Sequence, residues 1–345
     1  MRRTVATGIG IAAIAALALT GCGQVGGGSA GGGTKSGSKD GPLTMVTVVK
    51  ISGVGWFDRM EVGVKDYAKQ SGNDARQEGA DDASPEKQIQ IIQDLIPQKP
   101  DAITVVPNSP EALETVLKQA RDQGIVVVTH EAAGITNADA DIEAFDNRAY
   151  GAKIMDNLAE CMGGTGEYVQ FVGGLTAKTH MDWVGGAYDE QQAKFSKLKR
   201  VEDPVESKED ENVAYQRTKE LLAKYPNLTG IQGSAGTDVA GAARAVQEAG
   251  LADKVCVMGT SIPSVAKKYL ADGSIDKIFF WDPAKAGEAQ LKIAELLVKG
   301  EKVDNGTDLG IEGYKSLKKL DGFDNVFVGD AAVIVDRKNV DEYDF

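Results

Sequence analysis

The sequence is poor in the side chains that most often bind metal ions or carry out nucleophilic chemistry. It has only two histidines and three cysteines in 345 residues. None of them has the spacing of a zinc site, so we expect neither a metal nor a cofactor. No His-Glu-x-x-His or phosphate-binding loop motif is present, and no Gly-x-Ser-x-Gly elbow occurs, since the match at 27–31 lies in a Gly- and Ser-rich stretch. The sequence therefore gives no support to an enzyme.

Positive charge is scarce as well. The chain has 38 lysines and arginines against 51 aspartates and glutamates, which gives a formal charge of −13 and a pI near 4.8. Such a surface repels nucleic acid, so we expect no nucleic-acid partner. Since no local basic cluster is present, a highly charged anion is also a poor ligand.

Long apolar runs are confined to the first 22 residues. An apolar stretch over 5–19 follows two arginines and ends in Leu19-Thr20-Gly21-Cys22, which resembles the cleavage site of a bacterial lipoprotein. We predict a signal peptide over 1–21 and a lipid anchor on Cys22, which fixes the protein to the extracytoplasmic face of a membrane. A plain signal peptide or an N-terminal membrane helix is the alternative. Residues 22–41 are mostly Gly, Ser and Lys, which predicts a flexible linker.

Beyond the anchor, only Cys161 and Cys256 remain. Export permits a disulfide, but the sequence does not show whether the two cysteines meet. Cys256 lies in a strand-like run, residues 254–258, which favours a small buried core residue.

Apolar runs alternate with helical patterns from Met45 onward. Short apolar runs such as 45–51 and 102–106 predict buried strands, and Ser84-Pro85 marks a helix start because serine caps and proline suits the first turn. This alternation predicts an α/β fold with parallel sheets that are covered by helices on both faces. More than ten such elements exceed one sheet, so we predict two doubly wound parallel-sheet lobes.

Aromatic and imidazole side chains gather where predicted strands end, at Trp56, His130, His180, Trp183 and Trp281. The carboxyl ends of strands are where open α/β sheets bind ligands. Carboxylates stand beside four of these residues, and Lys50 ends the first strand. An aromatic face covers the C–H side of a sugar ring while carboxylates accept hydrogen bonds from its hydroxyls, so the pattern favours a polyhydroxylated ligand.

Asp282 is the strongest candidate among these carboxylates. It follows a predicted buried strand, in Trp281-Asp282-Pro283. The alternative is that Asp282 only caps the helix that begins at Pro283.

Four motifs carry a family resemblance: Lys50-Ile-Ser-Gly-Val-Gly-Trp-Phe57, Ser234-Ala-Gly-Thr-Asp-Val-Ala-Gly-Ala-Ala243, Gly259-Thr-Ser-Ile-Pro-Ser-Val265 and Phe280-Trp-Asp282. On these motifs, residues 45–340 resemble the type I periplasmic sugar-binding proteins of ABC transporters, in particular the autoinducer-2-binding and rhamnose-binding lipoproteins.

The resemblance implies two lobes joined by three crossings, near 146–150, 281–283 and 310–315. The N-terminal lobe is then 42–146 plus 283–312, and the C-terminal lobe is 147–282 plus 313–345. Ligand binding favours a closed form of such lobes, which a permease senses.

The resemblance also implies ligand contacts. The lysine and the strand-end aspartate of the autoinducer-2 binders become Lys50 and Asp282, and their second aspartate becomes Glu131. Their Asp-Gln pair becomes Thr179-His180, and their Pro-x-Ala contact becomes Ser234-Ala-Gly236. Together with Phe57 and four of the five aromatic and imidazole residues at predicted strand ends, the predicted ligand-binding residues are Lys50, Trp56, Phe57, His130, Glu131, Thr179, His180, Trp183, Ser234, Gly236 and Asp282.

These differences favour a monosaccharide or related polyol over autoinducer-2, because a site that pairs specific hydroxyls rejects a ligand that lacks them. We predict a monomeric extracytoplasmic lipoprotein, in the periplasm or at the cell surface, which delivers its ligand to the permease of an ABC importer. The alternatives are an autoinducer-2 binder and a sensory sugar binder that feeds a receptor. A two-lobed enzyme has less support.

Overall fold

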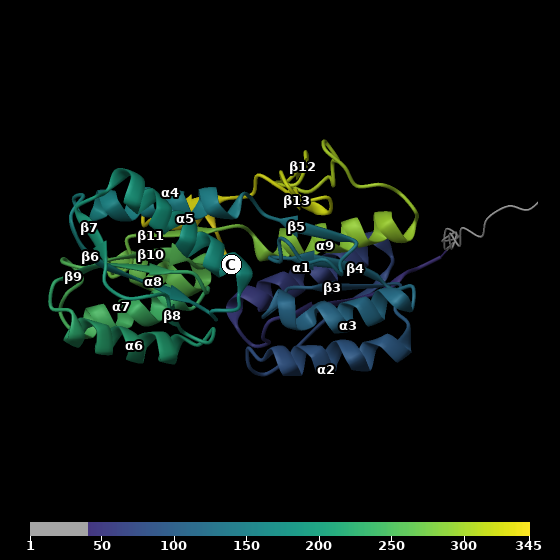
Figure 1. Cartoon of the computed structure of the whole chain (residues 1–345), viewed down its shortest axis with the longest axis horizontal. Helices are drawn as coiled ribbons and strands as arrows, with labels where there is room; N and C mark the ends of the chain where they lie inside the picture. Colours follow the sequence, from purple (N-terminus) through teal and green to yellow (C-terminus); the bar gives the residue numbers. More distant parts are fainter. Residues whose placement is uncertain (1–40) are drawn as a thin grey trace, which may run out of the picture. The chain divides into compact units, whose positions relative to one another are not determined.

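The computed structural model describes residues 41–345. The predicted signal peptide, Cys22 and nearly all of the predicted linker lie outside the described residues. Two sheets with helices on both faces make up the described chain (Figure 1), which confirms the predicted fold class. Within these residues, none of the helices combines the length and the apolar character that crossing a membrane requires.

The first sheet has the order β12-β13-β5-β4-β3-β1-β2 and is parallel except for β12 at its edge. Its central strands are buried on both faces because helices cover them. Its strands are β1 (Thr44–Val49), β2 (Asp74–Gly79), β3 (Ala102–Val105), β4 (Val126–His130), β5 (Ala140–Glu143), β12 (Lys318–Lys319) and β13 (Val326–Val328).

Alternate residues of β1 point to opposite faces of this sheet. Val46 and Val48 belong to the apolar cluster under α2 and α3, whereas Met45 and Val49 belong to the cluster under α1 and α9. Helices α1 and α9 approach closely at Gly63, where a Cβ atom would lie 1.9 Å from the carbonyl oxygen of Ala284. The helices are α1 (Gly55–Ser71), α2 (Pro85–Leu95) with the 3-10 turn η1 (Ile96–Gln98), α3 (Pro110–Asp122) and α9 (Pro283–Val298).

The second sheet has the order β14-β11-β10-β9-β6-β7, with β8 paired to β6 and with β14 antiparallel at the edge. Figure 1 shows α4 and α5 over one face and α6, α7 and α8 over the other. The strands are β6 (Gly166–Val172), β7 (Leu198–Arg200), β8 (Val205–Glu206), β9 (Leu228–Gly233), β10 (Cys256–Thr260), β11 (Lys277–Phe280) and β14 (Val333–Val335). The helices are α4 (Asn147–Cys161), α5 (Lys178–Lys194), α6 (Glu211–Lys224), α7 (Asp238–Glu248), α8 (Pro263–Asp272) and the 3-10 turn η2 (Val340–Glu342).

The chain crosses between the two sheets three times. It leaves the first sheet after β5, returns after β11 and leaves again after β13. The last crossing differs from the prediction near 310–315, because β12 and β13 extend the first sheet and only β14 joins the second. The apolar run over 326–335 therefore forms two strands in different sheets. Gly329 separates them where the chain passes close to Gly313, whose carbonyl oxygen lies 2.5 Å from where a Cβ of Gly329 would be.

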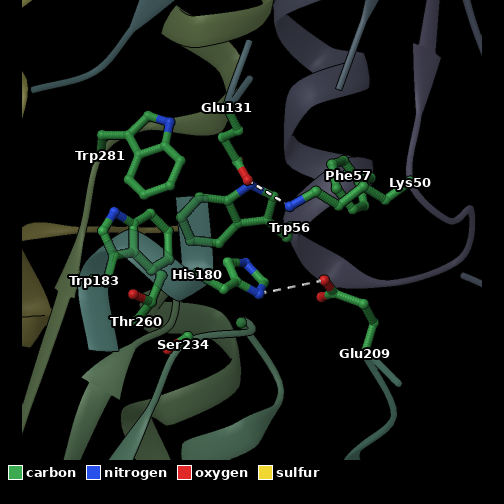
Figure 2. A pocket seen from close by; sticks show the side chains of 11 residues that line it. Lys50, Trp56, Phe57, Glu131, His180, Trp183, Glu209, Ser234, Thr260 and Trp281 are labelled. Carbon is green, nitrogen blue, oxygen red and sulfur yellow. Dashed lines mark hydrogen bonds and ion pairs between the residues drawn. The ribbon is translucent and has the colours of Figure 1, made fainter. Parts of the chain in front are cut away.

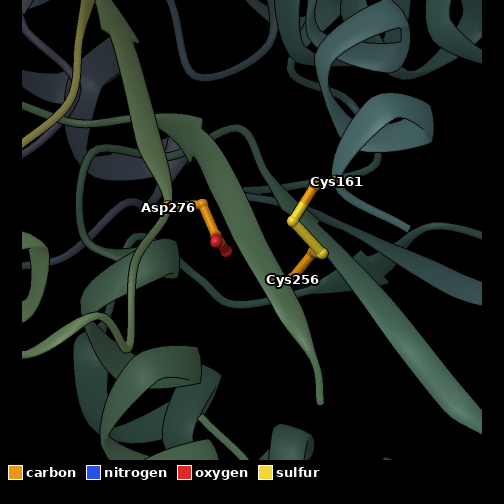
Figure 3. A group of neighbouring side chains, drawn as sticks. All are labelled: Cys161, Cys256 and Asp276. Carbon is orange, nitrogen blue, oxygen red and sulfur yellow. A yellow bond between two sulfur atoms is a disulfide. The ribbon is translucent and has the colours of Figure 1, made fainter. Parts of the chain in front are cut away.

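A disulfide joins Cys161, at the end of α4, to Cys256, at the start of β10 (Figure 3). The sequence left open whether these cysteines meet. The interpretation of Cys256 as a small buried core residue is wrong, because it is disulfide-bonded and only partly buried. The carboxylate of Asp276 lies beside the two sulfur atoms and accepts a hydrogen bond from the Val257 backbone N–H at 2.9 Å. Within residues 41–345, these three side chains are the one group of histidines, cysteines and carboxylates that lie close enough together to hold a metal ion. Because its sulfurs are bonded to each other, the group offers no thiolate to a metal.

Candidate functional site

A small cavity lies where both sheets end (Figure 2). Each sheet contributes residues from the carboxyl ends of its strands or from the helices that follow them. The cavity is lined by Lys50, Trp56, Phe57, Glu131, His180, Trp183, Glu209, Ser234, Gly236, Thr260 and Trp281.

Lys50 and Glu131 form a buried ion pair on the first-sheet side of the cavity. Their side chains are 3% and 4% exposed, and the Lys50 Nζ donates to Glu131 Oε2 at 2.5 Å. Burial alone lowers the pKa of Lys50, but the neighbouring carboxylates, Glu131 foremost, more than offset this and raise it. The ammonium group is therefore charged and already has a partner before any ligand binds.

Three tryptophans form an aromatic wall. Trp56 lies edge-on to Trp281 with ring centroids 4.6 Å apart, and Trp183 lies 5.6 Å from Trp281. The indole N–H of Trp183 donates to Asn147 Oδ1 at 2.8 Å, and that of Trp281 donates to His130 Nε2 at 3.2 Å. Because these two N–H groups have protein partners, both indoles offer the cavity carbon surface.

His180 is buried beside this wall and is neutral. The backbone N–H of Gly173 donates to its Nδ1 at 3.1 Å, so the ring proton lies on Nε2. Burial lowers the pKa of His180 well below its usual value, and the charge of Lys50 adds to this effect. No residue within 41–345 accepts from this Nε2–H, so the neutral imidazole can donate a hydrogen bond to a ligand.

Glu209 enters the cavity from the second-sheet side (Figure 2). Burial raises the pKa of this carboxyl to about 7, although Lys50 acts in the opposite direction. Both cavity carboxylates have backbones in the left-handed region, with φ of 61° at Glu131 and 58° at Glu209. Such conformations are strained for residues other than glycine and gather at functional sites.

Comparison with known proteins decides the family. A model described as a periplasmic binding protein domain matches residues 45–302, which is most of the chain. The chain belongs to this family. The resemblance to the type I periplasmic sugar-binding proteins is thus confirmed.

Individual relatives of this periplasmic binding protein carry sugar names. The D-xylose-binding periplasmic protein of Haemophilus influenzae is 26% identical over 264 residues, covering 74% of this chain and 75% of that protein. LsrB from Clostridium saccharobutylicum in complex with AI-2 has a TM-score of 0.82 and 21% identity, over 88% of this chain and 100% of that one. An ABC transporter solute-binding protein from Clostridium phytofermentas with bound L-rhamnose has a TM-score of 0.80 and 22% identity, over 88% of this chain and 98% of that one. At these identities the two structures show the shared fold alone.

The structure brings eight of the eleven predicted ligand contacts of this binding protein to one cavity. They are Lys50, Trp56, Phe57, Glu131, His180, Trp183, Ser234 and Gly236. They come from distant parts of the sequence and from both sheets, as expected for a site between two lobes.

Asp282, the strongest sequence candidate, does not line this cavity. Its carboxylate accepts from the Arg59 guanidinium at 2.9 and 2.7 Å and from the Ala284 backbone N–H at 2.9 Å. The alternative of helix capping is therefore observed. The ion pair to Arg59 of α1 uses both oxygens, and Oδ1 accepts from Arg59 and from the helix start alike. In this binding protein Asp282 fixes the start of α9 against α1.

His130 and Thr179 also lie outside the cavity lining. His130 is buried, and its Nδ1 lies 2.5 Å from the carbonyl oxygen of Ile142, which can only accept. Its Nε2 accepts from Trp281, so His130 orients an indole that lines the cavity. Thr179 is buried one residue before His180, and its hydroxyl oxygen has no hydrogen-bond partner in the part of the chain that the structure describes.

Three cavity residues are absent from the predicted contacts: Glu209, Thr260 and Trp281. Trp281 had a sequence signal, since it is one of the aromatic residues at the ends of predicted strands. Thr260 ends β10, and its hydroxyl lies 3.0 Å from the hydroxyl of Tyr150. Glu209 had no signal of its own, because it follows a strand of two residues and precedes the helix cap Asp210.

Proposed function

We propose that this periplasmic binding protein captures a monosaccharide or related polyol between its two lobes and delivers it to the permease of an ABC importer. The cavity carries the proposal, because it combines the aromatic wall with hydroxyl, carboxylate and imidazole groups. Carbon surface suits the C–H faces of a sugar ring, and the polar groups suit its hydroxyls. The relatives named for D-xylose and seen with L-rhamnose support this ligand class.

A site built from both lobes favours the closed form when a ligand is present, since only the closed form makes all contacts. The permease would then distinguish the loaded protein by its closed shape. We expect the binding protein to do this as a monomer, without turning over its ligand.

A thermal-shift screen tests the ligand class. Pentoses, hexoses, deoxyhexoses, polyols and autoinducer-2 are added singly, because a ligand that binds only the native state raises the melting temperature. A rise with a sugar or polyol supports the proposal, and a rise with autoinducer-2 alone favours the alternative. Mass spectrometry of the recovered ligand separates binding from catalysis, since an altered sugar would mean an enzyme.

Ser234→Ala should weaken ligand binding by about 2- to 10-fold without lowering stability, as expected for one hydrogen bond of about 0.5–1.5 kcal/mol. The Ser234 hydroxyl is buried, lines the cavity and has no hydrogen-bond partner within residues 41–345. Calorimetric titration and urea unfolding give the two quantities.

The matched control is Ser274→Ala. That hydroxyl is also buried but donates to Asp272 Oδ1 at 2.6 Å, and it does not line the cavity. It should show the opposite pattern, with reduced stability and unchanged affinity. Equal affinities of Ser234→Ala and the native protein would remove Ser234 from the site.

We further propose that the protein is anchored at the extracytoplasmic face of the membrane through a lipid on Cys22. The Leu19–Cys22 motif and the periplasmic family support this location. Fatty-acid labelling in cells should mark the native protein and not Cys22→Ala, which should be recovered free of the membrane fraction. Membrane-bound Cys22→Ala would contradict the anchor.

A further inference from the structure

Glu209 is a buried carboxylate that accepts no hydrogen bond from any residue of the described range, 41–345. The residue is 9% exposed and lines the cavity. Its nearest charged or titratable contact within residues 41–345 is His180 Nδ1, 3.9 Å from Glu209 Oε1. That nitrogen already accepts from the Gly173 N–H, so it has no proton to donate. An ionised carboxylate in such a place is costly until something pairs with it.

The surrounding charges do not supply that partner. Lys50 is the cation that acts on Glu209, but its ammonium group is bonded to Glu131. The carboxylate of Asp238 also acts on Glu209, and it is held by the backbone N–H groups of Ser234 and Ala235. The cavity lining therefore has one lysine against two carboxylates, Glu131 and Glu209, and its net charge is negative when Glu209 is ionised.

The remaining walls of the cavity favour positive charge as well. Trp56, Phe57, Trp183 and Trp281 line it, and the faces of aromatic rings attract cations. Tryptophan gives the strongest such attraction, and the exclusion of water increases it.

We propose that Glu209 is the counter-ion for a protonated amine on the ligand, so that the preferred ligand is an amino sugar or an aminated polyol. This inference rests on the proposed function and names the ligand class within it. The hydroxyls of such a ligand face Ser234 and His180, and its ammonium group donates to the Glu209 carboxylate. The pKa of about 7 that burial gives Glu209 agrees with a carboxylate that lacks a partner in the empty cavity.

Matched ligands test the inference on the native protein. D-glucose, D-glucosamine, N-acetyl-D-glucosamine and D-glucuronate are titrated by calorimetry at pH 7.5, followed by the same series built on galactose and an aminated polyol with its parent. The amines should bind about tenfold more tightly than their hydroxyl parents, because a charge-assisted bond replaces a neutral one. The neutral N-acetyl forms should lose this gain, and the acids should bind most weakly.

Glu209→Gln keeps the size of the side chain and removes its charge. The ratio of amine to parent affinity should fall from about tenfold to near one in this variant. The matched control is Asp203→Asn, which removes a fully exposed carboxylate of the same lobe and should keep the native ratio. Circular dichroism checks that both variants fold. If Glu209→Gln does not fold, the affinities of the matched ligands for the native protein test the inference by themselves.

The outcomes separate this inference from the proposed function. Neutral sugars that bind as tightly as their amines, or more tightly, would overturn the role of Glu209 and leave a sugar-binding protein. Failure of every sugar, amino sugar and polyol to bind would overturn both.

Discussion

Replacing Lys50 by methionine should lower the free energy of unfolding by about 3–5 kcal/mol and abolish ligand binding. The substitution leaves Glu131 buried at 4% exposure without its ion-pair partner, and removing one member of a buried pair costs about this much. The charges of Glu143 and Glu209 also act on Lys50, so its loss leaves several carboxylates to repel one another. Urea unfolding followed by tryptophan fluorescence measures the change.

Two controls make this result specific to the buried pair. Lys285→Met breaks the pair with Glu312, in which the side chains are 37% and 80% exposed, and should cost less than about 1 kcal/mol. Adding Glu131→Leu to Lys50→Met removes the uncompensated carboxylate and should recover much of the lost stability. A Lys50→Met protein as stable as the native one would show that the pair does not contribute to the fold.

Loss of the disulfide should lower the free energy of unfolding by about 2–4 kcal/mol. The bond joins residues that are 95 positions apart, and closing so long a loop restricts the unfolded chain strongly. Scanning calorimetry of Cys161→Ser/Cys256→Ser should show a lower melting temperature than the oxidised native protein.

Reduced native protein provides the comparison for the double serine variant. Its melting temperature should match that of the variant once mass spectrometry confirms two free thiols. Ligand affinity should stay unchanged in both, because neither cysteine lines the cavity. An unchanged melting temperature after complete reduction would contradict the expected contribution.

The sequence was sufficient to predict the α/β class and the two-lobed arrangement. The central strands are short apolar runs such as β1 and β3, and serine–proline pairs mark the starts of α2 and α3. Strands of two or three residues, such as β8 and β12, carry too little pattern to be detected. The run over 326–335 appears as one strand in sequence because both of its halves are apolar. Only the pairing partners show that they belong to different sheets.

The candidate site also has residues that the sequence predicts and residues that it does not. Lys50 and the tryptophans have signals because their residue types are unusual at strand ends. Asp282 follows the same pattern but lies outside the cavity, since Arg59 and the first turn of α9 compete for its carboxylate. Arg59 is 223 residues away in sequence, so no local pattern reveals this competition. Glu209 depends on a left-handed backbone turn that its neighbours in sequence do not indicate.

The position of the disulfide has a topological consequence. The covalent ring between Cys161 and Cys256 begins after the first crossing and closes before the second, so none of the three crossings lies inside it. The ring therefore tethers one lobe to itself and leaves the relative rotation of the lobes unrestrained. A protease cut inside the ring would leave the chain in one covalent piece, whereas a cut at a crossing would divide it.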